Sequence, residues 1–361
     1  MALLALSLLI GLVTGSFLVH CIYWLPHEAS TLKPTLSYCD CQKSVAWRYR
    51  IPVLGWLWLR GRCPACGERI SAHYPLAEGI TGVFFALAYW RFGFPVAIPI
   101  WLLGSVLVVT TFIDIEHFLI PDLVSKPAIV AGVLVSLLVP ELHETTSRFL
   151  AVGLSILGAM VGGGLLFLVG ELGKLAFGRY KVILPEPVPF RFERLPPDDA
   201  QIVIGNDEFR CGDHFFRKSD RIRIRAEEVI INDQPFRATE FSLYYDHLET
   251  AVGAIPLADL HSLTGRTAYA EFPREAMGLG DVKLIAAIGA FTGWPGVLFT
   301  IAAASLISAL YGVATVLLRR RDWSAKIPFG PYLAAGALLW IFCGKEFLGL
   351  AFAQPWPSTP H

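Results

Sequence analysis

The chain contains 361 residues, of which 54% are hydrophobic and only 17% are charged, and its mean hydropathy is +0.54. This composition is too apolar for a soluble globular protein and predicts a chain that crosses a membrane several times. The formal net charge is zero, and no basic run alternates with aromatic residues, so we expect no nucleic-acid partner.

Apolar runs of membrane-spanning length recur along the chain. They predict an all-α polytopic membrane protein with about eight transmembrane helices, near residues 1–23, 75–92, 95–113, 123–140, 149–175, 281–294, 296–318 and 331–353. The first run lacks a basic leading segment and an obvious small-residue cleavage site, so we interpret it as a retained span. An atypical signal peptide is the alternative.

Basic residues orient the predicted spans. Clusters follow the first, fifth and seventh runs, and all three fall on one side if eight spans alternate: Lys43, Arg48, Arg50, Arg60, Arg62 and Arg69; Lys174, Arg179 and Lys181; and Arg319, Arg320 and Arg321. The positive-inside rule makes that side cytoplasmic. Asp114 and Asp281, each at the end of a predicted span, are then expected to lie together on the cytoplasmic face, with both chain termini outside.

Two pairs of cysteines lie in a polar cytoplasmic loop predicted over residues 24–74. They are Cys39 with Cys41 and Cys63 with Cys66. Paired thiols on the reducing side favour a metal site over disulfides, because Zn²⁺ takes four thiolates in tetrahedral geometry. We predict a structural zinc site, with reduced thiols or a lost site as the alternative. The other cysteines are isolated and are interpreted as small apolar residues: Cys21, Cys211 and Cys343.

A second polar stretch contains β-branched residues that alternate or cluster between turn signals. Residues 201–204, 221–225 and 229–231 predict strands, and residues 205–207 and 232–233 predict turns. We predict a small β-rich cytoplasmic domain inserted between spans. The domain organisation is then a first span over 1–23, the Cys-rich loop over 24–74, spans with the first aspartate over 75–177, the inserted domain and its linker over 178–274, and spans with the second aspartate motif over 275–361.

Two aspartates lie where apolar runs meet polar sequence. Asp114 closes one run, and Asp281 opens another in Gly278-Leu279-Gly280-Asp281. An acidic group at the edge of the hydrocarbon is costly unless it is wetted, paired or protonated, so each is a functional-site candidate. If the two face each other, like-charge repulsion separates their ionisations and leaves one acid and one base to activate water.

Simpler explanations exist for each motif alone. Asp114 could cap the next helix, and Gly278 and Gly280 could serve only to permit a tight turn. The glycines also have a chemical use, because residues without Cβ atoms let an extended substrate backbone approach Asp281. The predicted topology places both aspartates on one face, which favours a catalytic dyad.

Further motifs occur in a fixed order across nearly the whole chain. They are Gly15-Ser16-Phe17-Leu18, Tyr23-Trp24-Leu25-Pro26, Ile51-Pro52-Val53-Leu54-Gly55-Trp56-Leu57, Leu59-Arg60-Gly61-Arg62-Cys63-Pro64-Ala65-Cys66, Tyr74-Pro75-Leu76-Ala77-Glu78, Ile113-Asp114 through Pro121-Asp122, Glu275 through Leu284, and Ile327-Pro328-Phe329-Gly330-Pro331. With these motifs the chain resembles the type IV prepilin peptidases, bacterial GxGD aspartic proteases that also N-methylate the new pilin N-terminus. The usual pattern of that family lacks the β-rich insertion.

The resemblance implies roles for particular residues. It implies that Asp114 and Asp281 are the catalytic pair, that the four thiols belong to a loop associated with metal binding and methylation, and that S-adenosylmethionine is the methyl donor. The chain departs from the family in the Cys39-x-Cys41 spacing, where two intervening residues are usual, and at Val19 and Trp24, where asparagine and arginine are usual. No glycine-rich nucleotide fingerprint is present, so methyl transfer depends on the resemblance alone.

We therefore expect an aspartic endopeptidase of the bacterial inner membrane. It would remove the leader peptide of type IV prepilins or type II secretion pseudopilins at the cytoplasmic face. Three other classes stay open. A presenilin-like intramembrane protease would cut within a span, a carrier or channel would place its carboxylates at mid-depth, and a non-catalytic scaffold would tolerate Asp114→Asn.

Overall fold

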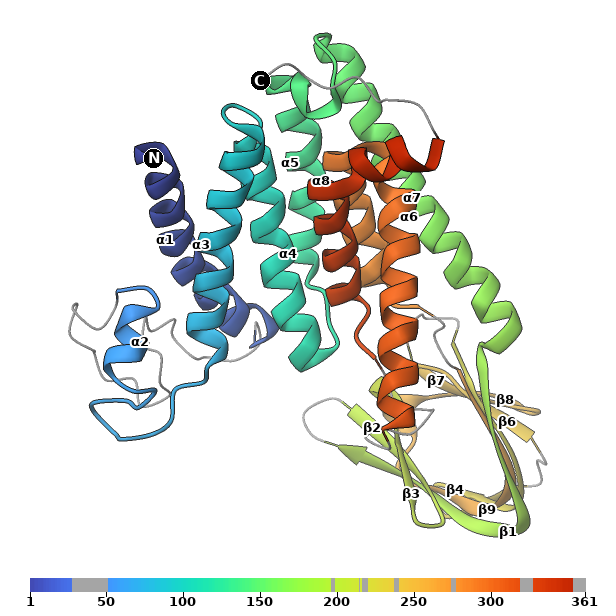
Figure 1. The fold of residues 1–361 in the computed structure, drawn as a ribbon. Helices are drawn as coiled ribbons and strands as arrows, with labels where there is room; N and C mark the ends of the chain where they lie inside the picture. Colours follow the sequence, from blue (N-terminus) through green and yellow to red (C-terminus); the bar gives the residue numbers. More distant parts are fainter. Residues whose placement is uncertain are drawn as a thin grey trace. The chain divides into compact units, whose positions relative to one another are not determined.

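The computed structural model describes residues 1–27, 51–195, 199–213, 215, 220–236, 240–273, 277–318 and 327–352. The chain divides into two compact units (Figure 1). One unit combines Met1–Phe167 with Leu279–His361, and the other is Leu168–Gly278. The first is helical and the second is built mainly from strands.

Helices of the first unit lie side by side (Figure 1). In chain order they are α1 (Ala2–Trp24), α2 (Leu54–Trp58), α3 (His73–Phe92), α4 (Ala97–His117), α5 (Asp122–Leu138), the first part of α6 (Arg148–Phe177), α7 (Leu279–Leu317) and α8 (Gly330–Phe352). Short 3₁₀ turns follow α1 at Leu25–His27 and α5 at Pro140–His143.

The prediction of an all-α protein with about eight transmembrane helices is wrong. Within the described residues, four helices are long and apolar enough to cross a membrane: Ala2–Trp24, Ala97–His117, Arg148–Leu175 and Leu279–Leu317. The runs at 281–294 and 296–318 both fall on α7, which is interrupted at Gly293 by non-helical backbone (φ 70°, ψ 176°), and α5 has only 17 residues. A nine-stranded sheet makes the chain a mixed α and β protein. The four apolar helices do support its assignment as a membrane protein.

Small residues let the helices of the first unit approach closely. A Cβ atom at Gly15 on α1 would lie 2.7 Å from the Cα atom of Glu78 on α3. A Cβ atom at Gly158 on α6 would lie 2.1 Å from the carbonyl oxygen of Gly289 on α7. In lipid, where apolar burial gives helices no advantage over the acyl tails, close packing of this kind drives their association. Gly158 and Gly289 therefore set the spacing of α6 and α7.

The second unit is an antiparallel sheet. Its strands are β1 (Arg179–Leu195), β2 (Asp199–Ile204), β3 (Asp207–Arg210), β4 (Ile222–Ile231), β5 (Gln234–Phe236), β6 (Glu240–Leu243), β7 (His247–Thr250), β8 (Gly253–Pro256) and β9 (Leu263–Pro273). The order is β3-β2-β1-β9-β4-β6-β7-β8, and β5 also pairs with β4. Arg179 on β1 lies opposite Pro273 on β9. The chain therefore enters and leaves the sheet at adjacent positions, which suits a domain inserted between two helices.

Alternation along β4 separates an apolar face from a charged one. Ile222 and Ile224 are fully buried, whereas Arg223 and Arg225 point to the opposite face. The buried face packs on Phe272 and Leu263 of β9 and on residues of the neighbouring strands. Strands β2 and β4 thus cover the stretches predicted as strands, except for Arg221, which directly precedes β4.

The close approach of α6 and α7 leads to a stability prediction. Gly158→Ala or Gly289→Ala should lower the unfolding free energy by about 1–3 kcal/mol, because the added methyl group would overlap the facing backbone. Thermal unfolding in detergent measures the effect. Gly153→Ala is the matched control on α6, since no atom lies within 4 Å of its Cβ position. Equal melting temperatures for Gly158→Ala and Gly153→Ala would contradict this packing.

Candidate active site

Asp114 lies in the last turn of α4 and is 5% exposed. Its Oδ2 atom accepts a hydrogen bond from the backbone N–H of Gly330, the first residue of α8, at 2.9 Å. Phe118 caps the C-terminus of helix α4: it adopts the left-handed conformation and donates its N–H to the Asp114 carbonyl oxygen. The next helix begins eight residues after Asp114, at Asp122. Asp114 therefore does not cap that helix, and its carboxylate is bound to a distant part of the chain.

Asp281 lies in the first turn of α7. Its Oδ1 atom is buried and has no hydrogen-bond partner in the part of the chain that the structure describes. Ile120 links the two carboxyl groups: it packs against Gly280, which directly precedes Asp281, and against Gly330, whose N–H binds Asp114. The structure thus brings together the two aspartates that the sequence singles out. A buried carboxyl oxygen without a partner is expected to seek a proton, water or a substrate group.

Close packing at the starts of α7 and α8 explains why glycine occupies positions 280 and 330. A Cβ atom at Gly280 would lie 2.8 Å from the Cβ of Ile120, and one at Gly330 would lie 2.8 Å from Asp114 Oδ2. Ile120 is also the neighbour of Gly330, at 3.3 Å from the same Cβ position. Glycine is therefore needed at both helix starts for α7 and α8 to approach the end of α4. Gly278 directly precedes α7.

Three polar contacts that the sequence motifs do not reveal lie near the two aspartates in sequence. Lys283, two residues after Asp281, forms an ion pair with Asp122, which also contacts Lys126 at 2.6 Å. Glu116, two residues after Asp114, contacts His73 Nδ1 at 2.6 Å. Lys283 thus ties the start of α7 to the start of α5. In the sequence, the only indication of these contacts is that Lys283 and Glu116 each lie two residues after an aspartate.

The contribution of Gly330 was also missed, although its motif is conspicuous. Ile327-Pro328-Phe329-Gly330-Pro331 contains no side chain that could act as an acid, base or ligand. Its functional group is a backbone N–H at a helix start, where the first amides have no intrahelical partner. A sequence motif without polar side chains gives no chemical signal for such a role.

The cysteine cluster is only partly described. Cys39 and Cys41 lie outside the described residues. Cys63 and Cys66 lie in a tight turn, in which Gly67 has a φ of +75° and donates its N–H to the Cys63 carbonyl oxygen at 2.9 Å. Such a turn can present two thiolates to one metal ion. The described residues contain no group of three or more His, Cys, Asp or Glu side chains that could hold a metal, so the predicted zinc site is not supported by a complete ligand set.

Comparison with known proteins identifies the family. Residues 9–92 match the family described as Bacterial Peptidase A24 N-terminal domain, and residues 101–185 and 236–313 match the type IV leader peptidase family. The prepilin leader peptidase/N-methyltransferase of Aeromonas hydrophila is 30% identical over 309 residues, which cover 83% of this chain and 69% of the relative. The chain belongs to the type IV leader peptidase family. Family membership confirms the predicted resemblance and makes the chain a peptidase.

Other relatives extend the similarity. The prepilin leader peptidase/N-methyltransferase of Pectobacterium carotovorum subsp. carotovorum is 25% identical over 359 residues, 91% of this chain and 89% of the relative. That of Myxococcus xanthus is 39% identical over 125 residues, 34% of this chain and 37% of the relative. No solved structure matches the chain. The leader peptidase match contains Asp114 and Asp281 but omits residues 186–235, which include strands β2 to β4.

The hydrogen bond to Asp114 gives a testable prediction for the peptidase. Gly330→Ala should lower the rate of peptide cleavage by roughly 100-fold, because a methyl group 2.8 Å from Asp114 Oδ2 must displace the carboxylate. Initial rates on a leader-bearing substrate in detergent measure the loss. Gly312→Ala is the control, since the nearest atom to its Cβ position is a flexible side-chain carbon of Ile327 at 3.4 Å. Wild-type cleavage by Gly330→Ala would contradict the role of this contact.

Proposed function

We propose that the chain is an aspartic endopeptidase that removes the leader peptide of type IV prepilins or type II secretion pseudopilins. The observation that supports it best is the convergence of the Asp114 and Asp281 segments at Ile120 and Gly330, although the whole second unit, Leu168–Gly278, separates them in sequence. The names of the relatives support the prepilin class of substrate. We place the reaction at the cytoplasmic face of the bacterial inner membrane.

The environments of the two carboxyl groups suit a shared-proton mechanism. In this mechanism one ionised aspartate takes a proton from a water molecule, which attacks the scissile carbonyl carbon. The protonated partner donates a hydrogen bond to the carbonyl oxygen and stabilises the charge that develops on it. Transfer of a proton to the leaving nitrogen then completes hydrolysis. The backbone N–H of Gly330 keeps Asp114 oriented throughout.

The depth of the pair determines which peptide bond is accessible. Asp114 lies in the last turn of α4 and Asp281 in the first turn of α7, both of which are candidate membrane spans. A substrate with a polar leader and an apolar stem would present the junction between them at this depth. A presenilin-like protease would instead cut within a span, and a carrier would place its carboxylates at mid-depth. The position at the helix ends therefore favours leader removal.

A second activity is proposed from the relatives. Their names include N-methyltransferase, and we infer that this chain also transfers a methyl group from S-adenosylmethionine to the new N-terminus. The match of residues 9–92 to the family's N-terminal domain supports a shared role for the Cys-containing loop. The described residues do not single out a site for S-adenosylmethionine, so no step of methyl transfer is assigned to particular side chains.

The catalytic assignment is tested by removing each carboxyl group in turn. Asp114→Asn and Asp281→Asn should each reduce cleavage of a prepilin below detection while the protein stays inserted, because an amide cannot exchange the proton. Asp122→Asn is the matched control: it removes a nearby carboxylate that we place outside the reaction, and it should retain most of the activity. Mass spectrometry of the substrate gives the readout. Substantial cleavage by either dyad variant would exclude the assignment.

The zinc hypothesis is tested by elemental analysis. If Cys39, Cys41, Cys63 and Cys66 hold zinc, freshly purified, unchelated protein should contain about one metal ion per chain. Cys63→Ser should lose most of that metal, whereas Cys343→Ser, which changes an exposed cysteine on α8, should lose none. Absence of metal from the unaltered chain would favour reduced thiols.

A further inference from the structure

A cavity of about 610 Å³ lies in the second unit, where the end of α6 meets the sheet. Four basic side chains line it: Lys174, Arg179, Arg221 and Arg223. The apolar span of α6 ends at Leu175. Since α6 itself supplies part of the lining, we expect the cavity to lie near the boundary between hydrocarbon and water, at the depth of lipid headgroups.

In the ion pairs around the cavity, the basic side chain is more exposed than the acidic one. Glu171, Asp220 and Glu271 also line it, and two of these acids are more buried than their basic partners. Arg179 donates to Glu271 at 2.9 Å, and the two side chains are 63% and 10% exposed. Lys174 lies 3.8 Å from Asp220, and these side chains are 22% and 9% exposed. In each pair the cation lies nearer to solvent than the acid, so an approaching anion meets the cations first.

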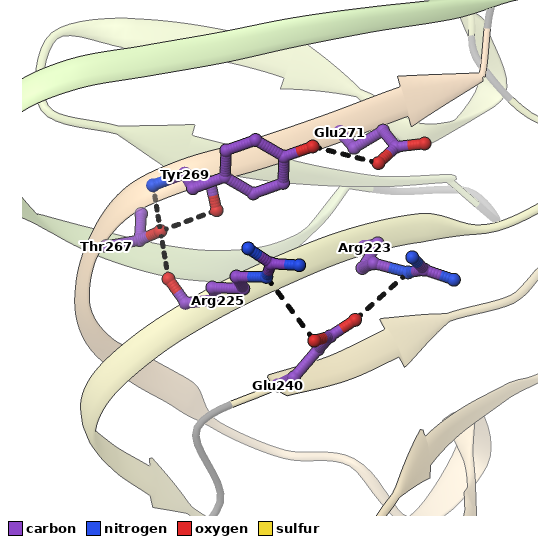
Figure 2. A network of polar contacts seen from close by, with 6 residues as sticks. All are labelled: Arg223, Arg225, Glu240, Thr267, Tyr269 and Glu271. Carbon is purple, nitrogen blue, oxygen red and sulfur yellow. Dashed lines mark hydrogen bonds and ion pairs between the residues drawn. The ribbon is translucent and has the colours of Figure 1, made fainter.

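The other two basic side chains are only partly neutralised. Arg221 donates to the Tyr244 hydroxyl at 3.5 Å and forms no ion pair with the residues that the structure describes. Arg223 and Arg225 share the Glu240 carboxylate, at 3.2 and 3.4 Å (Figure 2). The four basic side chains that line the cavity outnumber its three acids, Glu171, Asp220 and Glu271, so the lining keeps a net positive charge.

Glu271, the partner of Arg179, accepts a second hydrogen bond that fixes its orientation. The Tyr269 hydroxyl donates to Glu271 at 3.0 Å (Figure 2). Burial, and secondarily the neighbouring Glu271 carboxylate, raise the pKa of Tyr269, so its hydroxyl keeps the proton that this hydrogen bond needs. Glu271 is therefore oriented before any ligand arrives, and Arg179 is positioned with it.

We propose that this cavity binds the phosphate group of an anionic membrane phospholipid. Guanidinium groups match phosphate oxygens with two parallel hydrogen bonds, and the cavity offers three of them with an ammonium group. Exposed aromatic rings at Tyr180 and Tyr245 adjoin lining residues in sequence, and tyrosine is enriched at the headgroup level of membranes. The end of the α6 span favours a lipid over a soluble phosphate as the source of the anion.

Native mass spectrometry of the full-length chain tests the proposal. The chain is reconstituted in nanodiscs of phosphatidylcholine with a minor fraction of phosphatidylglycerol, and the retained lipids are counted. We expect the chain to retain one phosphatidylglycerol molecule. The double variant Arg221→Gln and Arg223→Gln should lower the affinity for this lipid about 30-fold, which is roughly fivefold per basic side chain. The pair Lys174→Gln and Arg179→Gln should act similarly if the strand variant misfolds.

Two controls separate the outcomes. Arg191→Gln removes an exposed arginine of the same sheet, which pairs with Glu193 and does not line the cavity, so this variant should retain the lipid. The double variant Arg221→Lys and Arg223→Lys keeps the positive charge and should retain part of the lipid. Millimolar inorganic phosphate should leave the lipid bound. Displacement of the lipid by phosphate alone would contradict the proposal that the bound phosphate group belongs to a lipid. Equal retention of phosphatidylglycerol by all variants, or no preference for it over phosphatidylcholine, would contradict the proposal that the cavity is the binding site.

Discussion

The hydrogen bond from the Gly330 N–H to the Asp114 carboxylate joins residues 216 positions apart, and the geometry of the helical unit depends on it. A carboxyl group that is 5% exposed at the end of a membrane span needs a donor, because an unsatisfied buried charge would cost several kcal/mol. The start of α8 supplies that donor without adding another charge. The packing of Gly280 against Ile120 brings the start of α7, and with it Asp281, to the end of α4.

Glycine makes this convergence possible. Gly280 contacts Ile120 and Gly330 contacts both Ile120 and Asp114 so closely that a Cβ atom at either position would require a shift. Farther along α7, Gly289 meets Gly158 of α6 at a similar separation. Backbone contacts of this kind hold helices together in lipid. The candidate site therefore depends on small residues as much as on the acidic pair.

Several features were predictable from the sequence because their signals are local. The aspartates stand out as charges at the ends of apolar runs, and the alternation of Ile222 and Ile224 with arginines predicts the strand β4. The helix count failed because an apolar run in the sequence does not fix the length of the helix that it forms: α5 has only 17 residues, whereas α7 runs over 39 residues with a break at Gly293. The Gly330 and Lys283 contacts were not predictable, since each joins segments that are distant in sequence.

In the proposed reaction the two carboxyl groups act at the membrane boundary on a leader-bearing substrate. Incubating the purified chain with prepilins in detergent and reading the product termini by mass spectrometry tests it most directly. We expect one cut, at the junction between the polar leader and the apolar stem. Cuts within the apolar stem would contradict the account and favour an intramembrane protease of another kind.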